Sequence, residues 1–182
     1  MSKILTLEKL NLLDWDELQR AQLKHDRRYH PDILALNVID RLKHMALHQS
    51  KYAAKLIEAE DCHDSELLEK TLIDSFIIAV ATSNTLGQRL SQHLASHNDS
   101  LGNSKGFARS HLSALGRMAK ACESIDHLEG MDFRKGISSA NLDMIRSGLR
   151  EAKLRELDLA QGVAARLATV EEKSPYRYIF AE

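Results

Sequence analysis

Basic and titratable side chains recur at helical spacing in one segment of the chain. They are Arg41, His44, His48, Lys51 and Lys55, which we call the basic stripe. At about 100° per residue these side chains share one sector of a helix, and the apolar side chains of the segment point roughly the opposite way. Guanidinium, ammonium and imidazole groups in such a row could bind several phosphate oxygens at once. The spacing predicts a phosphate or nucleotide site. A solvated helix face is the alternative, because charged residues mostly lie at the surface.

A single acidic residue, Asp74, lies within the apolar sequence TLIDSFIIAV. A carboxylate among such neighbours is costly unless it is paired, bound to an ion or protonated. The preceding helix runs antiparallel in the expected fold, and its residues Lys51 and Lys55 have the best register to face Asp74. We therefore predict that Asp74 joins the basic stripe in one phosphate-binding or nucleotide-binding site. A purely structural ion pair between core helices is the alternative.

The two antiparallel helices that carry these residues resemble the core of the MazG-like all-α nucleoside triphosphate pyrophosphatases. That group includes the phosphoribosyl-ATP pyrophosphohydrolases. The resemblance covers residues 40–90, a little over a quarter of the chain. In the family, Glu-Glu-x-x-Glu on the first helix and Glu-x-x-Asp on the second hold Mg²⁺, which activates water for the release of pyrophosphate. The resemblance implies a nucleotide-binding hydrolase that forms a homodimer, with an antiparallel core over 37–97.

The chain departs from the family pattern at the metal ligands. Lys51 and Lys55 stand where glutamates are expected, and Thr71 replaces the glutamate that precedes Asp74. Lysine cannot ligate Mg²⁺, which needs oxygen donors. The resemblance therefore implies an altered or lost metal site, in which Mg²⁺ would depend on the acids that remain. Those acids are Glu58, Asp61 and Asp74.

Helix start and stop signals place the elements of the N-terminal half. Asp14 followed by Glu17 forms a capping box, and Pro31 ends the helix that begins there. Asp64 is a suitable N-cap for the helix that contains Asp74. The sequence predicts helices over 15–28, 37–60 and 64–86.

The C-terminal half begins after a linker over 98–106, which is rich in glycine, serine and asparagine. An amphipathic helix follows, and Gly130 is its expected C-cap. A last long helix is predicted over 138–172, with Gly148 and Gly162 as weak points and Pro175 just beyond its end.

Together these elements predict a single all-α domain over 1–182, built as a bundle of about five helices. The C-terminal part would form a helical hairpin over 107–172. Aromatic residues make up only 5% of the chain and prolines number two, which favours helices over sheets.

Composition excludes several classes of protein. The net charge is −1, so nothing general indicates a nucleic-acid or membrane partner. The longest apolar run, 76–81, is too short to span a bilayer. The N-terminal sequence MSKILTLEKL lacks the apolar core of a signal peptide. Cys62 and Cys122 fit no disulfide or zinc pattern, so we expect a cytoplasmic protein.

Other histidine patterns receive less weight. The sequence YHPD over 29–32 contains the HPD of J-domain co-chaperones, but their preceding helix is apolar where this chain has Gln22, His25 and Asp26. His93 and His97, like His44 and His48, have zinc-compatible spacing, yet neither pair has the glutamate of HExxH. Nine histidines make such pairs common by chance.

Two buried polar residues are expected further along the chain. His111 and Asp126 both point to the apolar side of their helix, where polar groups usually satisfy one another.

The sequence thus predicts a MazG-like nucleotide-binding protein and leaves open whether it is an enzyme. If it is one, it hydrolyses a nucleoside triphosphate to release pyrophosphate. The alternative is a non-enzymatic helical module that binds a protein partner or assembles with itself.

Overall fold

The structure is a computed structural model that describes residues 14–94 and 106–174. These residues form helices and no strands, which confirms the all-α prediction. The helices in chain order are α1 (Trp15–Tyr29), α2 (Pro31–Ala35), α3 (Val38–Asp61), α4 (Ser65–Leu86), α5 (Leu90–Leu94), α6 (Phe107–Asp126), α7 (Phe133–Leu154) and α8 (Leu159–Lys173). The described ranges therefore contain eight helices instead of about five.

Two caps predicted from the sequence, Asp14 and Asp64, and a third at Asn37 set the starts of the first long helices. Asp14, Asn37 and Asp64 each accept a hydrogen bond from the backbone N–H three residues on, at 2.9, 3.0 and 2.9 Å. These bonds satisfy backbone donors that have no partner within the helix. Gly87 ends α4 in the left-handed conformation, with φ of 64°, which glycine adopts at little cost.

The predicted boundaries of the C-terminal helices are wrong. His127, not Gly130, is the C-cap of α6, and α7 begins at Phe133. The predicted last helix is divided at residues 155–158, where Asp158 caps α8 by accepting a hydrogen bond from the Gln161 N–H at 2.9 Å. Neither predicted weak point breaks a helix, since Gly148 lies within α7 and Gly162 within α8. Most of the predicted linker and Pro175 lie outside the described residues.

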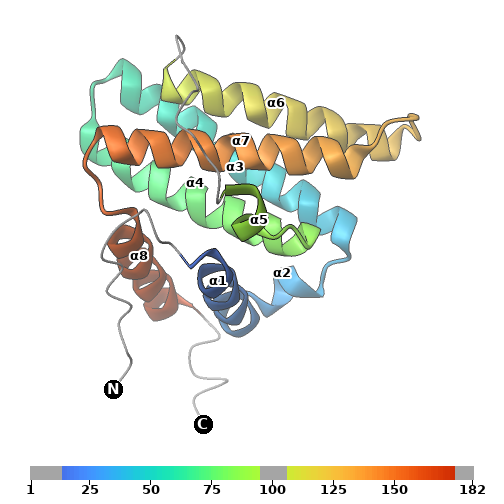
Figure 1. The fold of residues 1–182 in the computed structure, drawn as a ribbon, viewed down its shortest axis with the longest axis horizontal. Helices are drawn as coiled ribbons and strands as arrows, with labels where there is room; N and C mark the ends of the chain where they lie inside the picture. Colours follow the sequence, from blue (N-terminus) through green and yellow to red (C-terminus); the bar gives the residue numbers. More distant parts are fainter. Residues whose placement is uncertain (1–13, 95–105, 175–182) are drawn as a thin grey trace.

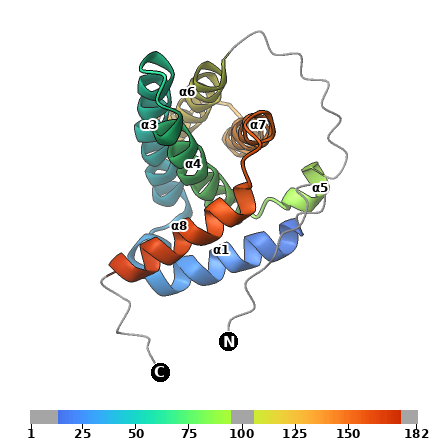
Figure 2. The same cartoon turned by 90° about the vertical axis from the view of Figure 1, so that its left-hand side faces the viewer.

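Four long helices, α3, α4, α6 and α7, form a bundle, and α1 and α8 lie crosswise against its α4 side (Figure 1). Figure 2 shows α1 and α8 side by side at the base of this bundle. The hairpin predicted over 107–172 thus consists of α6 and α7 alone, and α8 belongs to the second layer. Close approach at Gly162 makes this crossing possible, since a Cβ atom there would lie 2.6 Å from the Ile73 Cδ1.

The core between these layers is mainly aliphatic. Leu56, Leu72, Leu90 and Ile145 are fully buried in it, and this burial supplies most of the drive to fold. His111 is buried as expected, and its Nε2 lies 3.1 Å from the Gln49 Oε1. Asp126 is exposed instead, where it forms an ion pair with Lys43. Among the described residues, no helix is long and apolar enough to cross a membrane.

Candidate metal centre

The basic stripe divides between two environments along α3. Arg41 donates hydrogen bonds to the carbonyl oxygens of Leu34 and Leu36, so it holds the end of α2. His44 and His48 are half-buried, whereas the last two residues of the stripe, Lys51 and Lys55, are exposed. The N-terminal part of the stripe therefore faces the α1–α2 connection, and only its C-terminal part faces solvent.

Asp74 has a different partner from the predicted one. Its carboxylate accepts hydrogen bonds from Arg166 of α8, from Nε at 2.5 Å and from Nη2 at 3.2 Å. Arg166 reaches Asp74 because α8 crosses α4 one turn earlier, at Gly162. This pair raises the pKa of Arg166, chiefly through the hydrogen bond. Burial, with a smaller contribution from Asp74, raises the pKa of the neighbouring Tyr52 to about 12.

Replacing Arg166 by methionine should lower the free energy of unfolding by about 1–3 kcal/mol. The substitution leaves the mostly buried Asp74 carboxylate without its two charge-assisted hydrogen bonds. Urea denaturation measures the loss. Arg117→Met is the matched control, since Arg117 pairs with Asp143 at an exposed position and should contribute at most about 1 kcal/mol. Equal losses in the two variants would show that the Asp74–Arg166 pair stabilises the folded protein no more than an exposed ion pair does.

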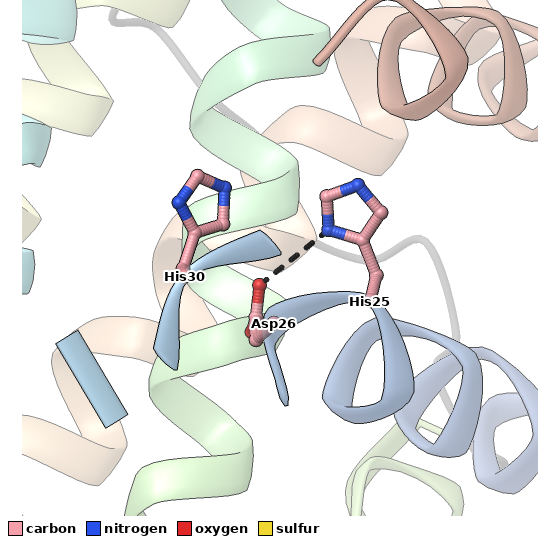
Figure 3. A group of neighbouring side chains, drawn as sticks. All are labelled: His25, Asp26 and His30. Atoms are coloured by element: carbon pink, nitrogen blue, oxygen red, sulfur yellow. Dashed lines mark ion pairs between the residues drawn. The ribbon is translucent and has the colours of Figure 1, made fainter. Parts of the chain in front are cut away.

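A cluster of three potential metal ligands lies at the C-terminal end of α1. His25, Asp26 and His30 each offer one ligand atom, and these atoms lie within 4.8 Å of one another. Figure 3 shows the two imidazole rings on either side of the Asp26 carboxylate. Asp26 also accepts a hydrogen bond from the Gln22 Nε2 at 2.8 Å, which orients the carboxylate.

The end of α1 brings these side chains together. His25 and Asp26 are neighbours on the last turns of α1, where their Nδ1 and Oδ1 atoms lie 3.8 Å apart. His30 is the C-cap, with φ of −136°, because Pro31 follows it and begins α2. This change of direction places the His30 ring 5.8 Å from the His25 ring, centroid to centroid.

His25 is buried without a hydrogen-bond partner in the described part of the chain, which points to a bound ligand at its ring. It is 7% exposed, and neither of its ring nitrogens has a hydrogen-bond partner among the described residues. The 3.8 Å separation from Asp26 is too long for a hydrogen bond. Buried polar atoms in proteins nearly always have a partner, and the exceptions often mark an ion or a bound water. A metal ion between the three side chains would give one of the two His25 ring nitrogens a partner.

Two further imidazoles continue this cluster onto α3. The His44 and His48 rings lie 4.7 Å apart. Burial lowers the pKa of His30, Asp26 opposes the shift, and His25 and His44 add to it. The pKa of His48 is lowered to about 4, mainly by burial and then by Lys51 and His44. These lowered pKa values keep the His30 and His48 rings neutral at pH 7, which is the form that binds metals.

The residues predicted to hold Mg²⁺ do not belong to the group of three. Glu58 and Asp61 are exposed near the end of α3, and Asp74 is engaged by Arg166. Among the described residues, His25, Asp26 and His30 are the group of three whose ligand atoms lie close together. His93 is exposed on α5, and His97 lies outside the described residues.

The three candidate metal ligands were not predicted from the sequence, although Asp26 and His30 are four positions apart, as are the histidine pairs that were considered. His25 and Asp26 were considered only as departures from the J-domain pattern, and His30 only as part of its HPD. A histidine directly before a proline, one turn beyond a His-Asp pair, is a weak signal. The three side chains come together only because the chain turns at Pro31, and the spacing in the sequence does not predict the direction of that turn.

Comparisons with protein-family models, with curated proteins and with solved structures find no match for the chain. The MazG-like resemblance thus stays a prediction.

Proposed function

We propose that the protein binds a divalent transition-metal ion through His25, Asp26 and His30. The buried His25 ring carries this proposal, since both of its nitrogens lack a hydrogen-bond partner and it faces a carboxylate and a second imidazole. A carboxylate that is itself hydrogen-bonded, as Asp26 is by Gln22, is typical of metal ligands.

The chemistry of the ligands selects among metals. Two imidazole nitrogens and one carboxylate oxygen suit Zn²⁺, Co²⁺, Ni²⁺, Cu²⁺ or Fe²⁺, whereas Mg²⁺ prefers oxygen ligands alone. Three protein ligands leave at least one coordination position for water or another side chain. His44 on α3 is a candidate, because it is close enough to His30 to influence the pKa of that residue.

Titration of the chelator-stripped protein with Co²⁺ tests this function. Binding to nitrogen and oxygen ligands should produce visible absorption bands that saturate at one equivalent, and Zn²⁺ should abolish them by competition. The bands should be absent in His25→Asn and unchanged in His93→Asn, whose histidine is exposed on α5. Absence of any saturable signal in the unmodified protein would refute the proposal.

Nucleotide binding by the basic stripe is the second candidate function. The observation that favours it is the exposure of Lys51 and Lys55, which leaves both ammonium groups accessible to phosphate. In this proposal the protein is a MazG-like nucleotide-binding homodimer of the cytoplasm, catalytic or not. Mg²⁺ would assist at Glu58, Asp61 and Asp74.

A panel of nucleoside triphosphates with Mg²⁺, assayed for released pyrophosphate and for a rise in melting temperature, tests this second function. Turnover would establish an enzyme, and a thermal shift alone would establish binding. If neither is observed, the non-enzymatic helical module is favoured. In that case truncation after α7 should alter the oligomeric size measured by light scattering.

A further inference from the structure

A cavity of about 490 Å³ lies between the end of α4 and the first turns of α7, apart from the histidine cluster. Polar side chains that line it come from both segments and from α5. They are Gln88, His93, Asp132, Arg134, Lys135, Ser138 and Ser139. Leu86 and Leu142 give the same cavity an apolar part. Its volume lies in the range of about 300–1,000 Å³ that is usual for small-molecule sites.

Hydrogen bonds between the segments hold the walls of this cavity in place. The Arg134 Nη2 donates to the Leu86 carbonyl oxygen at 2.6 Å. The Gln88 Nε2 donates to the Ser138 carbonyl oxygen at 3.2 Å. The left-handed Gly87 turns the chain between these contacts. The cavity is therefore formed before a ligand arrives, which reduces the entropy lost on binding.

A buried polar network lies behind the Gln88 wall. The Gln88 Oε1 accepts a hydrogen bond from the Ser83 hydroxyl at 3.3 Å, and the Asn141 Nδ2 donates to that hydroxyl oxygen at 2.8 Å. Asn141 is fully buried, and its Oδ1 has no partner among the described residues. Such a network fixes the orientation of the Gln88 amide at the cavity wall.

The charges around the cavity favour an anion. Among the described residues, neither Arg134 nor Lys135 forms an ion pair with an acidic side chain. The one acid in the lining, Asp132, already accepts a hydrogen bond from the Lys135 backbone N–H at 2.9 Å. The Ser138 and Ser139 side chains add hydroxyl donors on the first turns of α7.

We infer that this cavity binds a small molecule that carries an anionic group, phosphate or carboxylate, on a partly apolar body. Arg134, Lys135 and the two serine hydroxyls would hold the anionic group through charge-assisted and neutral hydrogen bonds. Leu86 and Leu142 would contact the apolar body. This site is independent of the metal centre and is an alternative to the basic stripe as the place where a phosphorylated ligand binds.

Calorimetric titration with AMP, inorganic phosphate and benzoate, in the presence of a chelator, tests the inference. AMP and phosphate probe for a phosphate ligand, and benzoate probes for a carboxylate. We expect AMP or benzoate to bind the unmodified protein, and the better of the two to identify the anionic group. Phosphate should bind more weakly than AMP, because it lacks an apolar body.

Two double variants locate the binding. Lys135→Gln/Ser139→Ala changes exposed side chains of the cavity and should weaken binding by about tenfold, the effect of losing about 1.4 kcal/mol. Lys24→Gln/Lys70→Gln, a pair of exposed lysines outside the cavity lining, should leave the affinity unchanged. Both pairs are exposed, so the folded state should persist in each variant. The inference is overturned if AMP and benzoate both fail to bind at millimolar concentration, or if Lys135→Gln/Ser139→Ala leaves the affinity unchanged.

Discussion

Replacing both His25 and His30 by glutamine should lower the affinity of the protein for Zn²⁺ by at least about a hundredfold. The double variant removes two of the three ligand atoms that lie within 4.8 Å of one another. Loss of a residue that merely supports a ligand typically costs 10-fold to 100-fold in metal affinity, so loss of the ligands themselves should cost no less. Competition with a chromophoric chelator at pH 7 measures the dissociation constant.

A matched double variant and a measurement without metal distinguish two roles of His25 and His30, metal ligation and stabilisation of the fold. His93→Gln/His127→Gln removes two exposed imidazoles and should leave the affinity unchanged. In metal-free protein, His25→Gln/His30→Gln should cost little stability, because the His25 ring nitrogens make no hydrogen bond that could be lost. A large loss of stability without metal, with unchanged Zn²⁺ affinity, would assign these histidines a purely structural role.

The metal-free protein should lose stability as the pH falls from about 6.5 to about 4. Burial lowers the pKa of His111 in the folded protein to about 4, whereas an unfolded histidine has a pKa near 6.5. Between these values the unfolded state binds more protons than the folded state, so acid favours unfolding. The contribution of His111 is fully present above pH 6.5, and its loss is worth up to about 3 kcal/mol. His48 shifts in the same direction.

Urea denaturation of the protein and of His111→Gln, at pH 7 and at pH 4.5, measures this effect. Glutamine preserves a hydrogen-bonding group near Gln49, whose Oε1 lies 3.1 Å from the His111 Nε2. The variant should be less stable than the unmodified protein at pH 7, and the difference should shrink at pH 4.5. Parallel loss of stability in the two proteins would show that His111 does not titrate on unfolding.

Local signals in the sequence were sufficient to predict most of the helices. Asp14 and Asp64 cap their helices as expected, because a cap depends on residues only three positions apart. The division of the C-terminal segment into α7 and α8 was not predicted. Glycine is only a mild helix breaker, and the packing of Gly162 against Ile73 depends on a tertiary contact that spacing does not reveal.

The candidate sites, like the helices, could be predicted from the sequence only where they depend on local spacing. Periodicity correctly groups the basic stripe on one helix, but the partner of Asp74 depends on where α8 crosses α4. Arg166 is 92 positions away in the sequence. The histidine cluster depends instead on the conformation of one residue, His30, at the turn before Pro31. Patterns of regular spacing miss a site of this kind.

A long-range ¹H–¹⁵N correlation spectrum of the histidine rings, recorded before and after one equivalent of Zn²⁺, tests metal binding by His25 and His30 directly. It reports the tautomer and the ligation of each imidazole nitrogen. We predict that one ring nitrogen of His25 and one of His30 shift to the values of metal-bound imidazole, while His93 and His127 stay unchanged. If the His25 and His30 signals remain in place, the metal-centre proposal is contradicted.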